Sequence, residues 1–184
     1  MTPRLLEQYR KEIVPEMMKK FGLKNPMAVP KIDKIVVNMG VGEAIADVKI
    51  IERAIDELGQ ITGQKPIMRR AKKAIANFKI KENAPVGCKV TLRKAMMYEF
   101  MDRLISVAMP RIRDFRGIPP NSFDKAGNYT LGLQEQSIFA EIEFDRITRV
   151  QGMDITFVIK NSKSKEQSQE LLKLFGMPFK KDKE

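Results

Sequence analysis

One basic stretch accounts for most of the net charge of this 184-residue chain. Between Lys65 and Lys94 there are ten Lys or Arg residues and one acid, Glu82, so the local net charge is +9 against +11 overall. Lysines that only solvate a surface are usually accompanied by acids, and these are not. The stretch therefore predicts a surface for a polyanion, either nucleic acid or an anionic membrane. The ten cations are Lys65, Arg69, Arg70, Lys72, Lys73, Lys79, Lys81, Lys89, Arg93 and Lys94.

The composition argues against a membrane and against most kinds of catalysis. Residues 1–12 carry five charges, so we expect no signal peptide. No apolar run approaches the roughly 18–20 residues that a spanning helix needs. The absence of histidine and the single cysteine, Cys88, exclude histidine acid–base catalysis and Cys/His zinc sites. Carboxylate or lysine chemistry stays open, but we expect no cofactor, no metal, no small-molecule substrate and a reducing, cytoplasmic location.

A turn with two glycines offers the main competing hypothesis, a nucleotide-dependent enzyme. The run from Gly40 to Ala44 (GVGEA) follows a predicted strand and precedes a predicted helix, as a dinucleotide-binding turn does. The third small residue of that motif would fall at Ile45, and residues 62–64 lack the acid that would bind a ribose. We expect the glycines, Gly40 and Gly42, to form a tight turn or to let a backbone approach RNA.

Apolar periodicity predicts the elements that must position these residues. Pro15 should kink or divide the first helix. The order predicts a single α+β domain over residues 1–184, with helices packed on one face of a mostly antiparallel sheet. We also expect a long basic loop at about 71–85 and a frayed basic tail at about 177–184. The predicted helices cover residues 3–22, 47–62, 95–109 and 164–175, and the predicted strands cover 31–39, 66–70, 86–93, 129–133 and 153–160.

Alternation along the strands would place polar side chains on the open face of the sheet. Long cations there can pair with phosphates, and a threonine can bond sugar or base edges. Gly87 would let an external backbone approach closely. Phe78, among the basic loop residues, either stacks on a base or anchors the loop to the core, and the sequence does not decide between these. The open-face side chains are Lys34, Asn38, Lys89, Thr91 and Arg93.

A second charge asymmetry is acidic. Residues 134–145 contain Glu135, Glu141, Glu143 and Asp145 and no cation. The segment is either an ordinary solvated hairpin or, in a basic protein, a contact for a basic protein partner. Three arginines near the end of the third predicted helix offer a further RNA or protein contact. They are Arg111, Arg113 and Arg116.

Six motifs, in order along the chain, resemble the universal 5S-rRNA-binding ribosomal protein family ("L-five") in its bacterial form. They lie at residues 30–44 (PKIDKIVVNMGVGEA), 61–66 (ITGQKP), 72–79 (KKAIANFK), 90–93 (VTLR), 110–117 (PRIRDFRG) and 152–155 (GMDI). The resemblance implies a structural protein of the large subunit whose open, concave sheet face binds 5S rRNA and helps seat it in the central protuberance. It also implies contacts with P-site tRNA, with large-subunit rRNA and neighbouring central-protuberance proteins, and with a basic small-subunit head protein.

Three sets of contact residues follow from this resemblance and the charge pattern. The 5S rRNA set is Lys34, Asn38, Gly40, Gly42, Gln64, Lys65, Phe78, Lys89, Thr91 and Arg93. The tRNA set, in the basic loop, is Arg70, Lys72, Lys73, Asn77, Lys79 and Lys81. The intersubunit-bridge set is Arg111, Arg113, Arg116, Glu135, Glu141, Glu143 and Asp145. A general nucleic-acid chaperone, which would bind single strands without shape preference, is a further alternative.

Overall fold

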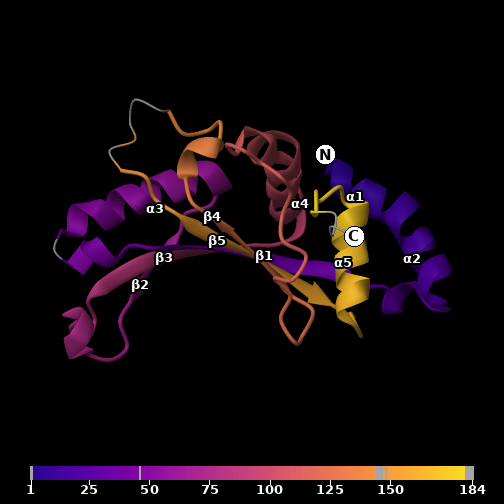
Figure 1. Ribbon diagram of the computed structural model, residues 1–184, viewed down its shortest axis with the longest axis horizontal. Coiled ribbons are helices and arrows are strands. Elements are labelled where there is room, and N and C mark those ends of the chain that lie inside the picture. The colour runs from indigo at the N-terminus through magenta and orange to yellow at the C-terminus, as the bar shows by residue number, and fades with distance from the viewer. Residues whose placement is uncertain (1, 46, 144–146, 148, 181–184) are drawn as a thin grey trace. The chain divides into compact units, whose positions relative to one another are not determined.

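The computed structural model describes residues 2–45, 47–143, 147 and 149–180. Within these residues, five strands form one sheet in the order β2-β3-β1-β5-β4, and β2 runs antiparallel to β3 (Figure 1). The predicted α+β class is confirmed. The strands are β1 (Lys31–Gly40), β2 (Ile67–Arg70), β3 (Pro85–Leu92), β4 (Tyr129–Leu133) and β5 (Met153–Lys160). The α-helices are α1 (Arg4–Gln8), α2 (Val14–Phe21), α3 (Val48–Thr62), α4 (Lys94–Arg103) and α5 (Lys165–Leu174).

Burial alternates along the strands because successive side chains point to opposite faces of a sheet. On β1, Ile35, Val37 and Met39 are fully buried, whereas Val36 and Asn38 between them are half-buried. The same alternation runs along β4 and β5. The sheet therefore has one covered face and one open face, as the sequence predicted.

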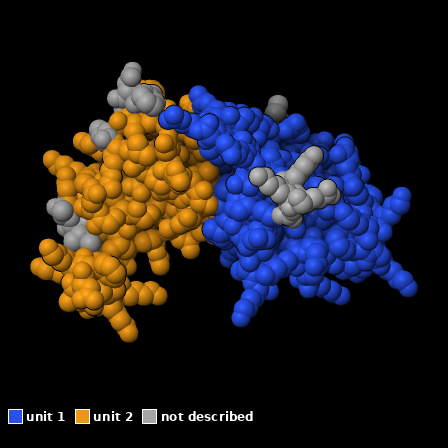
Figure 2. Space-filling view, viewed as in Figure 1, with its two compact units in different colours: residues 1–35, 93–131, 156–184 blue, residues 36–92, 132–155 orange. Residues whose placement is uncertain are grey.

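The chain divides into two compact units (Figure 2). Unit 1 comprises residues 1–35, 93–131 and 156–184, and unit 2 comprises residues 36–92 and 132–155. Unit 1 contains 22 Lys and Arg against 12 Asp and Glu, and unit 2 contains 12 against 11. β1, β4 and β5 contribute residues to both units, and the expectation of a single domain stays a prediction.

In unit 2, α3 packs on the covered side of β3, where Cys88 Sγ lies 3.8 Å from the carbonyl oxygen of Ala54 (Figure 1). The helix begins as predicted, because Oδ1 of Asp47 accepts the N–H of Lys49 at 2.9 Å. It ends at Gly63, whose φ of 70° is a left-handed conformation that glycine adopts without strain. The Asp47 cap and Gly63 therefore determine where α3 begins and ends, just before the basic stretch.

In unit 1, the first helix is interrupted near Pro15, as the sequence predicted. A π turn, Tyr9–Ile13, separates α1 from α2, and Pro15 lies in the first turn of α2. Proline has no N–H and cannot donate a helical hydrogen bond, and the π turn lies just before it. α4 similarly continues through a second π turn, Leu104–Ala108, before Pro110.

The prediction of a frayed tail from Met177 is wrong for its first four residues. Met177 is buried, and the ring of Phe179 lies edge-on to Tyr129 with centroids 5.5 Å apart. The backbone N–H of Lys180 donates to the carbonyl oxygen of Ile118 at 2.9 Å. Aromatic packing thus holds a segment whose charge suggested fraying. Residues 181–184 of that prediction lie outside the described residues.

Candidate nucleic-acid interface

The open face of unit 2 presents polar side chains from neighbouring strands. Asn38 on β1, and Lys89 and Thr91 on β3, are half-buried. β2 extends this surface, because Ile67 pairs with Lys89 across the antiparallel ladder, so the two side chains share a face. Ile67 is 69% exposed, which is unusual for a large apolar residue in a strand. We call Asn38, Ile67, Lys89 and Thr91 the open-face set; Ile67 was not predicted, because a β-branched strand residue suggests core.

Gln64 is held beside the open-face set by a turn that follows α3. The buried hydroxyl of Thr62 lies 2.7 Å from the carbonyl oxygen of Leu58 and 3.1 Å from that of Gln64. The amide Nε2 of Gln64 donates to the backbone oxygen of Thr91 at 3.4 Å. Lys65 follows and is exposed. Thr62 therefore positions a predicted contact residue, although no pattern in the sequence distinguished it from an ordinary helix terminus.

The three glycines near this surface have different surroundings. A Cβ added at Gly87 would lie 2.5 Å from the backbone oxygen of Met39, so the neighbouring strand itself requires this glycine. This corrects the expectation that Gly87 admits an external backbone. A Cβ at Gly40 or Gly42 would meet no described atom within 4 Å. The space beside the Gly40–Gly42 turn is therefore open.

Residues 71–84, which we call the arm, form the end of the β2–β3 hairpin and protrude from unit 2 (Figures 1 and 2). The loop predicted here is closed by backbone hydrogen bonds. Ala71 donates to Ala84 at 2.9 Å, and Ile75 and Ile80 bond each other at 2.9 and 3.1 Å. Arg70, at the end of β2, donates to the backbone oxygen of Asn83 at 3.1 Å. Five residues of the predicted tRNA set lie in the arm, and all are exposed: Lys72, Lys73, Asn77, Lys79 and Lys81.

Phe78 lies in the arm, in the 3-10 turn Ala76–Phe78, and its side chain is 70% exposed. The alternative in which Phe78 anchors the loop to the core is therefore wrong. The exposed ring of Phe78, which lies among cations, is accessible for stacking on a base.

Two members of the predicted 5S rRNA set, Lys34 and Arg93, belong to unit 1. β3 ends at Leu92, and Arg93 precedes α4 with an extended backbone (φ −139°, ψ 163°), so its side chain keeps the alternation from Thr91. Its Nη1 lies 3.4 Å from Oδ2 of Asp33, whose Oδ1 lies 2.9 Å from Nζ of Lys160.

A buried amide in the acidic segment forms hydrogen bonds with residues 149 and 151 of the same unit. Gln136 is 1% exposed; its Oε1 accepts the N–H of Gln151 at 2.6 Å, and its Nε2 donates to the backbone oxygen of Arg149 at 2.6 Å. The segment contains the 3-10 turn Gln136–Ile138, and Ile138 and Phe139 are buried, so the alternative of an ordinary solvated hairpin is wrong for residues 134–143. Gln136 was missed, since a glutamine in a polar run suggests a solvated residue.

The predicted bridge residues are divided between the two units. In unit 2, Glu135 and Glu143 are exposed and Glu141 is half-buried, while Asp145 lies outside the described residues. In unit 1, three arginines are exposed: Arg111, Arg113 and Arg116.

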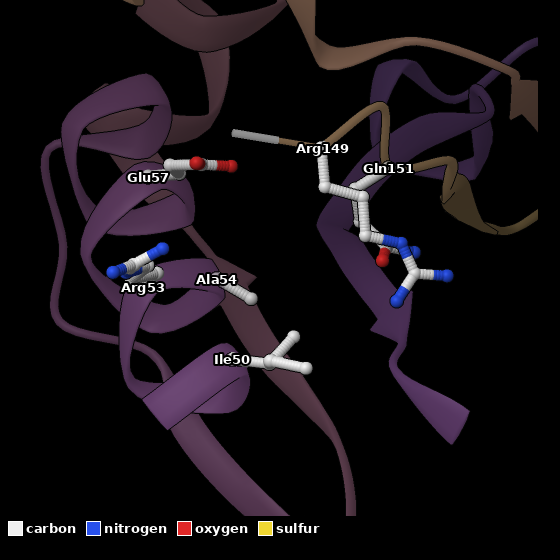
Figure 3. Close-up of a pocket in the computed structure, with 6 residues that line it drawn as sticks. All are labelled: Ile50, Arg53, Ala54, Glu57, Arg149 and Gln151. Atoms are coloured by element: carbon white, nitrogen blue, oxygen red, sulfur yellow. The ribbon is translucent and has the colours of Figure 1, made fainter. Parts of the chain in front are cut away.

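A groove of about 330 Å³ in unit 2 runs between α3 and residues 149–151 (Figure 3). Figure 3 shows Arg149 and Gln151 on one side and the helix on the other. Nε2 of Gln151 donates to the backbone oxygen of Gly40 at 2.9 Å, and Arg149 forms an ion pair with Glu43. The side chains on this side of the groove therefore hold the turn that contains Gly40 and Gly42. The lining residues are Ile50, Arg53, Ala54, Glu57, Arg149 and Gln151.

Other chemistries find little support in the part of the chain that the structure describes. There, no three His, Cys, Asp or Glu residues cluster as metal ligands would, and no helix is long and apolar enough to cross a membrane. Burial raises the pKa of Cys88 to about 11, so its reactive thiolate is scarce. A pyrophosphate would need the N-terminus of α3, which Asp47 already caps, so the nucleotide hypothesis is not favoured.

Comparisons with known proteins agree over nearly the whole chain. A family model described as ribosomal protein L5 matches residues 25–81, and one described as the C-terminus of the ribosomal L5P family matches residues 85–179. The chain is similar to a protein of Clostridium botulinum (strain Loch Maree / Type A3) named large ribosomal subunit protein uL5. The two are 59% identical over 179 residues, which are 97% of this chain and 99% of the relative. The protein of the same name from Clostridium tetani is 58% identical over the same shares.

Proposed function

Because this chain belongs to the ribosomal protein L5 family, it is a structural constituent of the large ribosomal subunit and not an enzyme, and we propose that it binds 5S rRNA. In this proposal it helps attach 5S rRNA in the central protuberance, beside large-subunit rRNA and neighbouring proteins. Membership of the large subunit agrees with the predicted cytoplasmic location. Two further contacts belong to the proposal, one with P-site tRNA and one with a basic protein of the small-subunit head.

The open-face set carries the 5S rRNA proposal. Its polar side chains are half-buried on paired strands, so their positions are fixed before RNA arrives. Fixed donors on a sheet can recognise the shape and sugar edges of a folded RNA, which charge alone cannot distinguish. The open space beside Gly40 and Gly42 lets a sugar–phosphate backbone approach the end of β1. Lys65 and Lys89 add charge at the same surface.

A filter-binding titration tests this proposal. The full chain is titrated with 5S rRNA and with an unrelated folded RNA of equal length, at several salt concentrations. Each phosphate that a cation neutralises releases counterions, so affinity should fall steeply as salt rises. We expect tighter binding of 5S rRNA at every salt concentration. Equal affinity for the two RNAs, or binding that does not change with salt, would contradict the proposal.

The arm supports the proposed tRNA contact. Its cations are exposed at the end of a protruding hairpin, where they can reach a polyanion. Replacing Lys72, Lys73 and Lys79 with alanine should speed dissociation of P-site tRNA from reconstituted ribosomes and leave 5S rRNA in place. The matched control removes three exposed lysines from unit 1, Lys19, Lys125 and Lys163. An equal change in both variants would show that only total charge matters.

The acidic segment supports the proposed bridge. Outside residues 65–92, which have a net charge of +7, unit 2 has a net charge of −6, so it offers a basic partner a complementary surface. Changing Glu135, Glu141 and Glu143 to glutamine should weaken subunit association, measured by light scattering, without affecting 5S rRNA binding. Changing Arg111, Arg113 and Arg116 to glutamine is the companion test for unit 1. If neither variant alters association, the bridge is absent from these residues.

A further inference from the structure

The open side of the sheet in unit 1 carries a cluster of charges with one acid at its centre. Oδ1 of Asp33 lies 2.9 Å from Nζ of Lys160, and Oδ2 lies 3.4 Å from Nη1 of Arg93. Lys34 is adjacent in sequence and half-buried. Asp33 thus uses its two oxygens to hold two cations from the strands on either side of β1, the residue after β3 and the last residue of β5.

The arrangement leaves most of the cations' donors available. A guanidinium has five N–H donors and an ammonium has three, and one bond to Asp33 uses one of each. The side chains of Arg93 and Lys160 are 54% and 58% exposed, whereas that of Asp33 is only 19% exposed. The carboxylate therefore lies beneath the cations, which present their remaining donors to solvent. The cluster keeps a net charge of +2 when Lys34 is included.

The carboxylate of Asp33 keeps its negative charge because of the cations around it. The hydrogen bond from Lys160 is the largest cause that lowers the pKa of Asp33, and the charges of Arg93 and Lys34 lower it further. Asp33 therefore stays ionised at neutral pH and keeps both cations in place. Long side chains lose rotamer freedom when they bind an anion, so holding them beforehand reduces that cost.

We infer that Lys34, Arg93 and Lys160 form a phosphate-binding site for the RNA backbone, and that Asp33 is the residue that positions it. This inference rests on the proposed RNA-binding function and adds Asp33 and Lys160, which the contact sets from the sequence did not include, to Lys34 and Arg93 in unit 1. Arg93 can bind a phosphate through two parallel N–H groups, and the two lysines supply point charges beside it. A phosphate contact does not read the base sequence. Its role is to fix the position and orientation of the RNA on the protein.

The test compares 5S rRNA binding by four variants in filter-binding titrations at several salt concentrations. Lys160→Ala should weaken binding about three- to tenfold and reduce the slope of log affinity against log salt by about one. Lys163→Ala removes the same charge from an exposed position outside the cluster and should change affinity less than twofold. If the two lysine variants bind alike, the inference is overturned. If wild-type protein shows no preference for 5S rRNA, the proposed function itself fails.

Asp33→Asn distinguishes a positioning role of Asp33 from a purely electrostatic one, because the two roles predict opposite changes in RNA affinity. The substitution makes the chain more positive, so a purely coulombic account predicts tighter binding of every RNA. The positioning account predicts binding of 5S rRNA about three- to fivefold weaker, with partial recovery in Asp33→Glu. Thermal unfolding checks that each variant is folded. Tighter binding by a folded Asp33→Asn protein would overturn the role of Asp33.

Discussion

The arm and three of the four open-face residues come from the same basic stretch, yet the two regions hold their side chains in different ways. The open-face side chains of Asn38, Lys89 and Thr91 are half-buried on paired strands, whereas the cations of the arm are exposed. Fixed, partly desolvated groups can discriminate between shapes, while exposed lysines supply charge and reach. The net charge of +9 is therefore divided between two surfaces. The open-face set is suited to selective binding, and the arm is suited to long-range electrostatic attraction.

The largest expected effect is on protein stability. It distinguishes Gly87, which the packing of two strands requires, from Gly40, which borders the open face. Gly87→Ala places a Cβ 2.5 Å from the backbone oxygen of Met39, so the sheet must shift. We expect a loss of about 2–3 kcal/mol in the free energy of unfolding, measured by urea denaturation. Gly40→Ala is the control, with a change below about 0.5 kcal/mol and weaker 5S rRNA binding. Equal stability of the two variants would contradict the described packing.

A somewhat smaller effect is expected at Gln136, which attaches the acidic segment. Gln136→Ala leaves the N–H of Gln151 and the carbonyl of Arg149 without their side-chain partner, which should cost about 1–3 kcal/mol of stability. Gln134, exposed two residues away, gives the matched control variant Gln134→Ala. Subunit association should weaken in the first variant only. Unchanged unfolding of Gln136→Ala would show that its buried hydrogen bonds do not hold the segment.

The arm should affect the salt dependence of RNA binding more than its selectivity. Removing Lys72, Lys73 and Lys79 should lower 5S rRNA affinity less than about fivefold, or about 1 kcal/mol, at physiological salt. Any loss should vanish as salt rises, because exposed cations are screened. A titration series from low to high salt measures this. A loss that persists at high salt would place the arm within the 5S rRNA site.

The smallest effect concerns acid stability. Lys160, Arg93 and Lys34 lower the folded-state pKa of Asp33 below its ordinary value of 3.8. A lowered folded-state pKa stabilises the protein above the unfolded pKa, and this stabilisation disappears as pH falls through the folded pKa. Asp33→Asn should therefore flatten the pH dependence of thermal unfolding below about pH 4 and leave its shape near pH 7 unchanged. If Asp33→Asn left the pH dependence of thermal unfolding in acid unchanged, the ion pairs of Asp33 would not form in solution.

Local rules predicted the elements because each depends on neighbouring residues. The alternation of Ile35, Val37 and Met39 gave the covered face of β1, and Asp47 and Ser164 mark the starts of two helices where they cap them. The left-handed ends at Gly22 and Gly63 follow from the lack of a side chain. Such signals need no knowledge of distant parts of the chain.

The missed features depend on residues that meet only after folding. Asp33 and Lys160 form their ion pair across two strands, and no periodic pattern relates them. Gln136 is buried because its amide pairs with the backbone at residues 149 and 151, which a polar run cannot reveal. Phe179 packs on Tyr129 although the residues that follow it are all charged. Charge and resemblance located the candidate RNA surface, whereas tertiary contacts decide which residues are held rigidly on it.

The ratio of affinities for 5S rRNA and an unrelated folded RNA of equal length tests the division of roles most directly. It is measured for two folded variants, Asn38→Ala with Thr91→Ala, and the triple arm variant of Lys72, Lys73 and Lys79. The account predicts that the open-face variant loses about tenfold or more of this preference at unchanged salt dependence. The arm variant should keep its preference with a shallower salt dependence. Loss of preference in the arm variant, with the open-face variant unaffected, would contradict the account.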